Sequence, residues 1–148
     1  MKKKYIIIKT IILLILLNSY GLSAKLSFFE EGKIFFDKKE FDKSKFFFEK
    51  DIVFNPKNEK SYLYLAKIFN IKNKVVEEEN NLNSVLILNP KNDEAIYMLS
   101  LIKIKQSNYD EAKKLIKKFE LVCDLFCGKK SEINNKLSKI TPDEKDKD

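Results

Sequence analysis

A tetrapeptide that recurs at a fixed distance is the feature that most constrains the fold of this chain. The sequence Asn-Pro-Lys-Asn occupies residues 55–58 and again residues 89–92, so that Pro56 and Pro90 lie 34 residues apart. In a helical sequence, a fixed period of about 20 to 50 residues is typical of stacked supersecondary units, because one unit cannot bury its apolar face alone. The repeat therefore predicts an array of similar units.

Composition indicates that these units are helical. The 148-residue chain contains three Gly and three Pro, and this scarcity of helix breakers favours long helices over many short strands. Hydrophobic residues make up 44% of the chain, which is enough for a packed core, and the length allows one domain. We therefore expect a single all-α domain.

Thirty-four residues is also the period of the tetratricopeptide repeat (TPR), and the sequence resembles that family within each unit. Gly32 stands where two helices of a repeat approach closely, and residues 108–112 (Asn-Tyr-Asp-Glu-Ala) resemble the family's most recognisable turn-to-helix segment. The resemblance covers residues 25 to about 126. It implies three repeats, at about 25–58, 59–92 and 93–126. Residues that depart from the family pattern are Ser44, Asp51, Glu78, Lys103 and Asp124.

The fold that this resemblance implies is a right-handed α-solenoid of about three helical hairpins with a C-terminal capping helix. The domain would extend over residues 25–140. Its capping helix would cover residues 130–140, with Ile133, Leu137 and Ile140 on one face. Residues 141–148 are charged and are predicted to be disordered. Side chains that we expect to cap helix N-termini are those of Ser27, Asn58, Asn92 and Asn108.

The first 24 residues are typical of a secretory signal peptide. Four lysines precede an apolar run at residues 11–17, and Ala24 offers a small residue at which a signal peptidase would cut. We predict cleavage after Ala24 and a periplasmic or cell-envelope location. The alternative is an uncleaved membrane anchor, although the run is shorter than the about 20 residues that span a bilayer. Contact with a membrane is expected only in that alternative.

Residue types that commonly carry out catalysis or recognise nucleic acids are missing. The chain has no His and no Arg, and all 29 of its basic residues are Lys. Without His there is no Ser-His-Asp triad, and two Cys cannot complete a four-ligand structural zinc site. The lack of Arg argues against recognition of phosphates or bases, which usually relies on its bidentate guanidinium. We therefore expect no enzyme activity, no cofactor, no metal and no nucleic-acid partner.

Stacked repeats form a concave surface, and in the tetratricopeptide family the first helix of each pair lines it. The resemblance therefore implies a groove that binds a peptide or a partner protein. The residues that we expect to line the groove are Phe29, Lys33, Phe36, Leu63, Lys67, Asn70, Tyr97, Leu101 and Lys105. Their mixture of apolar, basic and amide side chains suits an extended or helical peptide with some acidic character.

Alternatives exist for several of these residues. Lys33 and Lys67 lie one repeat apart and could hold a carboxylate, although the full set of clamp residues of the family's C-terminus-binding members is not matched. Phe29 and Phe36 could instead pack against neighbouring helices, as aromatic residues on repeat helices commonly do. A lysine on a helix is also commonly just solvated.

An aromatic triplet and a pair of cysteines stand out beyond the groove. A helix cannot direct three consecutive side chains inward, so within residues 46–48 we expect Phe48 in the core and Phe46 exposed. Phe46 would then be a second contact site or a self-association patch, unless the segment after the signal peptide covers it. Cys123 and Cys127 can form a structural disulfide in an exported protein, remain two buried thiols, or have a redox role, although their spacing is not the Cys-x-x-Cys of thioredoxin-like oxidoreductases.

The function that follows is non-enzymatic. We expect an extracytoplasmic adaptor or scaffold that binds another protein or a peptide in its groove. The alternative is a structural subunit that stacks end to end with copies of itself in a larger envelope assembly, through Phe46 and the terminal helices. The fold alone does not identify the partner.

Overall fold

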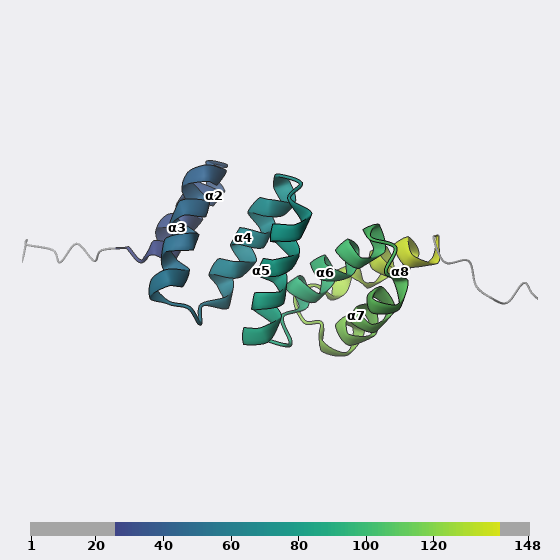
Figure 1. Cartoon of the computed structure of the whole chain (residues 1–148). Helices are drawn as coiled ribbons and strands as arrows, with labels where there is room; N and C mark the ends of the chain where they lie inside the picture. Colours follow the sequence, from purple (N-terminus) through teal and green to yellow (C-terminus); the bar gives the residue numbers. More distant parts are fainter. Residues whose placement is uncertain (1–25, 140–148) are drawn as a thin grey trace, which may run out of the picture.

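The computed structural model describes residues 26–139, and every regular element in that range is a helix (Figure 1). The predicted all-α fold is therefore confirmed. The elements are α2 (Phe28–Asp37), α3 (Phe41–Phe54), α4 (Glu59–Ile71), α5 (Val75–Leu88), α6 (Asp93–Lys105), α7 (Tyr109–Val122), the 3-10 helix η1 (Cys127–Lys129) and α8 (Lys130–Ser138). The predicted signal peptide, Ile140 and the predicted tail at residues 141–148 lie outside the described residues.

Helices α2 to α7 form three hairpins that are stacked in chain order (Figure 1). Each hairpin packs on the next, because α3 contacts α4 and α5 contacts α6. The C-terminal end of the stack is covered by α8, which contacts both α6 and α7. Between residues 26 and 139, no helix is both long and apolar enough to cross a membrane.

The turn inside each hairpin repeats with the 34-residue period. Lys39, Asn73 and Ser107 each adopt a left-handed backbone conformation, with φ of 61°, 55° and 58°. This conformation ends a helix by letting the amides that follow bind back to its last carbonyls. In the first hairpin, the amide of Glu40 donates to the carbonyl of Phe35 at 2.9 Å. The second helix of each pair can therefore start within a few residues of the first.

Three of the four predicted N-terminal caps are present. The side chains of Ser27, Asn92 and Asn108 accept hydrogen bonds from first-turn amides of α2, α6 and α7 at 3.2, 2.9 and 3.3 Å. These bonds satisfy amides that have no partner within the helix. The prediction for Asn58 is wrong, because its side-chain amide donates to the carboxylate of Asp51 at 2.7 Å instead.

The interior contains two hydrophobic clusters. A smaller cluster that includes Phe48 and Phe69 joins the first hairpin to α4. A larger cluster joins the second and third hairpins and reaches Ile133 of α8. Phe48 is fully buried and Phe46 is 57% exposed, as the spacing of the aromatic triplet predicts.

Side-chain size is matched across the two helices of each hairpin. Gly32 of α2 faces Phe48 of α3, and a Cβ atom added at Gly32 would lie 2.8 Å from the Phe48 ring. The residues 34 positions later are Ala66 and Leu82, which are both buried. From the first hairpin to the second, the residue on the first helix becomes larger (Gly32 to Ala66) while the residue on the second helix becomes smaller (Phe48 to Leu82). These opposite changes in size keep both hairpins tightly packed.

Three of the polar residues that depart from the family pattern, Ser44, Asp51 and Glu78, are buried with hydrogen-bond partners. Ser44 donates to the carbonyl of Gly32 at 2.8 Å, and Glu78 accepts from Asn70 at 2.9 Å. Among the described residues, no buried side-chain nitrogen or oxygen lacks a partner. The packing therefore accommodates these departures without leaving an unsatisfied group.

Asp51 is the centre of a polar junction between the first and second hairpins. Its carboxylate accepts hydrogen bonds from the side chains of Asn55, Asn58 and Ser61 at 3.0, 2.7 and 2.6 Å. Because Ser61 belongs to α4, these bonds join one hairpin to the next. The residues 34 positions after Asp51 and Ser61 are Val and Ala, so that the second junction is apolar where the first is polar.

The third hairpin is closed without another Asn-Pro turn. Helix α7 ends at Val122, and the chain then turns back over the start of α6. There the carboxylate of Asp93 accepts the backbone amides of Asp124 and Phe126 at 2.8 Å each. Burial alone would raise the pKa of Asp93, but the backbone amides outweigh it and lower the pKa below its ordinary value.

Candidate functional site

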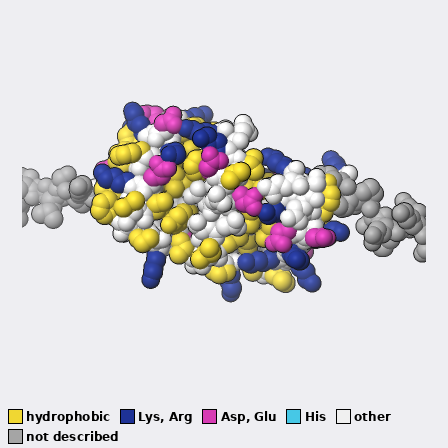
Figure 2. Space-filling model, viewed as in Figure 1, with side chains coloured by type: hydrophobic (Ala, Val, Ile, Leu, Met, Phe, Trp, Pro, Cys, Tyr) yellow, Lys and Arg dark blue, Asp and Glu magenta, His cyan; other side chains and the backbone are white. Residues whose placement is uncertain are grey.

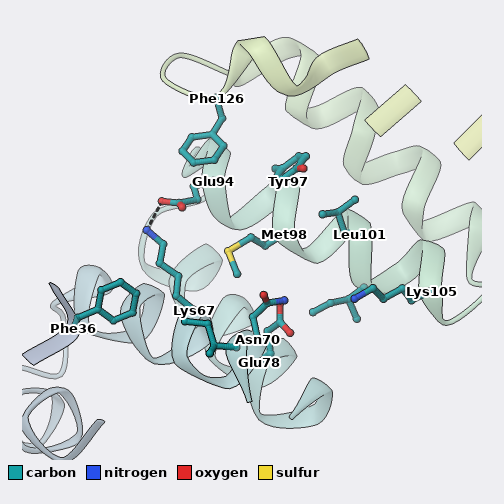
Figure 3. A pocket seen from close by; sticks show the side chains of 12 residues that line it. Phe36, Lys67, Asn70, Glu78, Glu94, Tyr97, Met98, Leu101, Lys105 and Phe126 are labelled. Carbon is teal, nitrogen blue, oxygen red and sulfur yellow. Dashed lines mark hydrogen bonds and ion pairs between the residues drawn. The ribbon is translucent and has the colours of Figure 1, made fainter. Parts of the chain in front are cut away.

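A hollow of about 440 Å³ lies along the first helices of the three hairpins (Figure 3). Its walls come from α2, α4 and α6, from the first turn of α5 and from the loop that precedes η1. The lining residues, which we call the groove, are Phe36, Lys67, Asn70, Ile71, Glu78, Glu94, Tyr97, Met98, Leu101, Ile102, Lys105 and Phe126.

Two thirds of the residues predicted for the groove line it. They are Phe36, Lys67, Asn70, Tyr97, Leu101 and Lys105. Equivalent positions on α2, α4 and α6 fall on the same side of the stack, because the hairpins repeat with little rotation between neighbours. Projection of the 34-residue period along the sequence therefore locates much of this surface.

The remaining three predicted residues lie elsewhere. The ring of Phe29 packs 5.8 Å from the rings of both Phe48 and Tyr64, so for this residue the alternative of packing against neighbouring helices describes the structure. Leu63 is 8% exposed and belongs to the larger hydrophobic cluster. Lys33 is exposed on α2 and does not line the groove, so that it does not form a lysine pair with Lys67 there.

Lys67 is engaged in an ion pair across two hairpins. Its Nζ lies 2.8 Å from Oε2 of Glu94, and a dashed line marks this contact in Figure 3. The two side chains are 25% and 21% exposed, and the ammonium also lies 5.0 Å from the ring centroid of Tyr64. The pair links α4 to α6 and offsets the charge of Lys67 inside the groove.

A second polar pair lies where α4 meets α5. Glu78 is 3% exposed, and it accepts the hydrogen bond from Asn70 that was described above. Burial raises the pKa of Glu78, opposed by the Asn70 bond and the positive charge of Lys105. One donor of the Asn70 amide is therefore occupied. Lys105 is exposed, and no ion pair involves it between residues 26 and 139.

Tyr97 is fixed by the capping helix. Its hydroxyl donates to Oε1 of Glu132 at 2.8 Å. Burial, together with this bond and the charge of Glu132, raises the pKa of Tyr97 to about 12. Lys129, the Tyr97 hydroxyl and Lys136 lower the pKa of Glu132 to about 2. The phenol therefore presents a neutral ring to the groove at neutral pH, and α8 holds that ring in place.

Phe126 forms the C-terminal wall of the groove, and it comes from a loop. Its backbone amide is held by Asp93, and its ring centroid lies 6.1 Å from that of Tyr97. A disulfide joins Cys123 to Cys127 across the same loop, with their Cα atoms 5.1 Å apart. Of the two states that the sequence allows for the cysteines, the structure therefore has the bonded one.

Sequence reasoning missed half of the lining residues. They are Ile71, Glu78, Glu94, Met98, Ile102 and Phe126. Glu94 and Met98 share one face of α6 with Tyr97 and Leu101, so helical spacing would have found them. Phe126 has no such signal, because its place depends on how the loop after α7 folds back over α6.

The groove is mostly apolar, and two of its four charged groups, Lys67 and Glu94, are paired with each other. Such a surface binds an apolar side chain by removing it from water, while fixed polar groups at the edge orient it. In the described part of the chain, no three His, Cys, Asp or Glu side chains lie close enough together to hold a metal ion.

No family model matches the sequence, and no curated protein matches it either. The structure, in contrast, is similar to solved structures of TPR domains. The TPR domain of OM64 from Arabidopsis has a TM-score of 0.69 and 18% identity, over 77% of this chain and 93% of that chain.

Two further TPR structures contain a bound ligand. The TPR2B domain of yeast Sti1, in a complex with pHsp70, has a TM-score of 0.68 and 16% identity over 75% of this chain and 93% of that chain. The first TPR of Spaghetti (RPAP3), bound to the HSP90 peptide SRMEEVD, has a TM-score of 0.65 and 20% identity over 76% and 86%. This protein therefore has the fold of a TPR domain, as the sequence predicts.

Proposed function

We propose that this protein is a non-enzymatic interaction module that binds a peptide segment of another protein in its groove. The observation that carries the proposal is the hollow of about 440 Å³ along α2, α4 and α6, with apolar walls and pre-positioned polar groups. A preformed site of this kind binds a ligand at a low cost in ordering, because its side chains are already fixed. Tyr97 and Lys67 are examples of such fixed groups.

The chemistry of the groove suits an amphipathic segment. Apolar side chains of Phe36, Met98 and Leu101 line its length and favour one or two apolar anchors on the ligand. Lys67 is neutralised by Glu94, whereas Lys105 is exposed at the edge and available to a carboxylate. The expected ligand is therefore an extended or helical peptide with apolar anchors and some acidic character.

The similar structures support this use of the fold. RPAP3 binds an HSP90 peptide, SRMEEVD, and Sti1 forms a complex with pHsp70 through their TPR domains. Both ligands are those of RPAP3 and Sti1 and are not assigned to this chain. For this chain they support the class of function, an interaction with a peptide or protein. Because Lys33 does not line the groove, the proposed contacts do not include a carboxylate held between Lys33 and Lys67.

We also propose that the protein is exported to the periplasm or cell envelope and is cleaved after Ala24. The lysines and the apolar run of the first 24 residues support this proposal. The Cys123–Cys127 disulfide is consistent with an oxidising compartment. The intact mass of the protein recovered from cells tests it, since removal of residues 1–24 leaves Lys25 as the new N-terminus.

A photocrosslinking experiment tests the groove. A photoreactive amino acid at Leu101 should capture a partner in the protein's own cells, and the same group at Ile87, which is 80% exposed on α5, should not. Mass spectrometry of the crosslinked product identifies the partner and the segment that is bound. Capture at both positions, or at Ile87 alone, contradicts binding in the groove.

Substitutions then measure the contribution of the groove. Met98→Glu places a charge among apolar side chains and should weaken binding of the identified peptide by about tenfold or more. Ile87→Glu makes the same kind of change on the outer helix and should leave affinity unchanged. Circular dichroism confirms that both variants are folded. Equal affinities for Met98→Glu, Tyr97→Ala and the unsubstituted protein would rule out the groove as the binding site.

A further inference from the structure

Three isoleucines at one position of the repeat have different environments. Ile34, Ile68 and Ile102 are separated by 34 residues, and they are 40%, 0% and 2% exposed. The second and third are buried because α4 packs on α3 and α6 packs on α5. No helix precedes α2 between residues 26 and 139, so the corresponding side of α2 has no neighbour in that range.

Aromatic side chains extend this side of α2 onto α3. The ring of Phe35 stacks on Phe47 with centroids 5.3 Å apart, and Phe28 lies 5.3 Å from Phe54. Phe46 and Phe54 are 57% and 64% exposed. Figure 2 shows hydrophobic side chains gathered over this end of the molecule. We call Phe28, Ile34, Phe35, Phe46, Phe47 and Phe54 the N-terminal face.

Two opposite charges flank the apolar stripe on α2, while the ammonium groups of Lys43 and Lys50 lie 5.4 and 4.4 Å from the ring centroids of Phe35 and Phe28. Glu31, Ile34 and Phe35 of α2 lie on one side together with the C-cap residue Lys38, because Ile34, Phe35 and Lys38 follow Glu31 by three, four and seven residues. Glu31 and Lys38 form no ion pair within the described residues, although the Lys38 ammonium lies 5.8 Å from the Phe35 ring centroid. The stripe therefore runs from acidic to apolar to basic.

A stripe with this order is complementary to itself. When two copies of α2 meet in opposite directions, the acidic end of each lies against the basic end of the other. The apolar centres then face each other and are removed from water. A two-fold arrangement of this kind needs no other chain, and it is the commonest symmetry of protein oligomers.

We propose that the N-terminal face is the interface of a homodimer in which α2 of one copy packs antiparallel against α2 of a second. Ile34 and Phe35 lie at the two-fold axis. Glu31 of each copy pairs with Lys38 of the other. The aromatic rings of α3 enlarge the contact on both sides of the axis, which explains why Phe46 and Phe54 are exposed in a single copy.

The dimer leaves both grooves open. Phe36, the groove residue on α2, packs toward α4 with its ring centroid 5.0 Å from that of Tyr64, on the side away from the N-terminal face. Two copies would therefore present two grooves. A partner with two binding segments, or a partner that is itself a dimer, would be held more tightly than by one groove, because the second contact is intramolecular.

Charge reversal tests the interface. The protein is expressed from the full sequence and purified. Analytical ultracentrifugation over a wide concentration range should then show a monomer–dimer equilibrium. Glu31→Lys and Lys38→Glu should each raise the dimer dissociation constant by about tenfold or more, because each variant places like charges opposite one another at both ends of the stripe. The double variant Glu31→Lys/Lys38→Glu should dimerise again, since the exchanged charges are complementary.

Lys117→Glu reverses an exposed charge on α7 and should leave the equilibrium unchanged. A monomer at every concentration overturns the proposal, whether residues 1–25 or a different protein cover the face. A dimer that survives both single reversals has its interface elsewhere. A double variant that stays monomeric contradicts the antiparallel pairing of Glu31 with Lys38.

Discussion

At the scale of single residues, the contact between Gly32 and Phe48 shows how the helices of a hairpin are matched. No Cβ fits at residue 32, because it would lie 2.8 Å from two ring carbons of the fully buried Phe48. One repeat later, the equivalent residues are Ala66 and Leu82, which are both buried in the larger hydrophobic cluster. The size of the residue on the first helix is therefore set by the size of the residue that faces it.

We expect Gly32→Ala to destabilise the protein. Overpacking costs about 1 to 3 kcal/mol, of which the higher helix propensity of Ala recovers up to about 1 kcal/mol. Urea denaturation followed by circular dichroism measures the difference. Gly128→Ala is the control, since a Cβ at that position meets no atom within 4 Å, and its effect should stay within about 0.5 kcal/mol.

The double variant Gly32→Ala/Phe48→Leu recreates the pair that the second hairpin uses. Phe48→Leu alone should lower stability by about 1 to 2 kcal/mol, because it leaves a cavity beside Gly32. In the double variant the methyl group of Ala fills part of that cavity. Its loss of stability should be smaller than the sum of the two single losses. A loss equal to the sum would show that the two positions do not constrain each other.

Glu78 and Glu79 are neighbours whose pKa values shift in opposite directions. Burial raises the pKa of Glu78 above its ordinary value of 4.5. A hydrogen bond from Lys103, opposed by some burial, lowers the pKa of Glu79. The folded protein therefore binds a proton at Glu78 more tightly than the unfolded chain does, and it loses stability as the pH rises through the raised pKa.

We expect Glu78→Gln to stabilise the protein at neutral pH by on the order of 1 kcal/mol, because the amide oxygen can still accept from Asn70 without burying a charge. The gain should vanish below the ordinary pKa of Glu, where both states are protonated. Glu79→Gln should do the opposite and destabilise at neutral pH, with the loss shrinking as pH falls. Urea denaturation at several pH values measures both, and a gain from Glu78→Gln that is independent of pH would contradict the assignment.

At the scale of elements, the two junctions between hairpins use different chemistry at the same positions. The first is polar, with Asp51 accepting three side-chain hydrogen bonds, and the second is apolar, with Val85 and Ala95. The polar junction also explains the missing cap on α4. Asn58 donates to Asp51, whereas Asn92 at the second junction is free to accept from the backbone amide of Ala95.

We expect Asp51→Val to lower the free energy of unfolding by about 2 to 4 kcal/mol, because the buried hydroxyl of Ser61 and the half-buried amide of Asn58 lose their acceptor. Asp51→Val/Ser61→Ala should recover much of this loss, since it removes one donor and reproduces the apolar junction. A double-mutant cycle by urea denaturation should give a coupling of about 1 to 3 kcal/mol. Additive losses would show that the two side chains stabilise the junction independently.

At the scale of the whole molecule, stability is the sum of hairpins and of the contacts between neighbours. The C-terminal end depends on several attachments close together. Asp93 holds the amides of the loop, the disulfide closes it, and Ile133 of α8 is fully buried against the larger cluster. The same attachments position Phe126 and Tyr97, so the stability of this end and the shape of the groove are linked.

We expect a dithiol reductant to lower the free energy of unfolding by up to about 2 kcal/mol, the entropy associated with a closed loop of this length. Reduction should also weaken peptide binding in the groove, because Phe126 would be held by Asp93 alone. Urea denaturation with and without reductant measures the change in stability. Titration of the protein with the peptide identified by photocrosslinking, with and without reductant, measures the change in affinity. Cys123→Ser/Cys127→Ser is the control and should not respond to reductant. Equal stability of both proteins in both conditions would contradict the prediction.

The sequence by itself determined the local features of the helices and their recurrence from one hairpin to the next. The 34-residue period, the scarcity of Gly and Pro, and three of the four caps predicted an all-α stack of hairpins, because helix formation and termination depend on neighbouring residues. The same period located six of the twelve groove residues. Periodicity can do this because equivalent positions point the same way in every repeat.

Only the tertiary structure decided which side chains from distant segments meet. It paired Lys67 with Glu94 and Asn70 with Glu78, brought Phe126 into the groove, and left Ile34 exposed where Ile68 and Ile102 are buried. Ile34, Ile68 and Ile102 are the same residue type at the same position of the repeat. The difference lies in whether another helix packs against them, which is a property of the stack and of its ends.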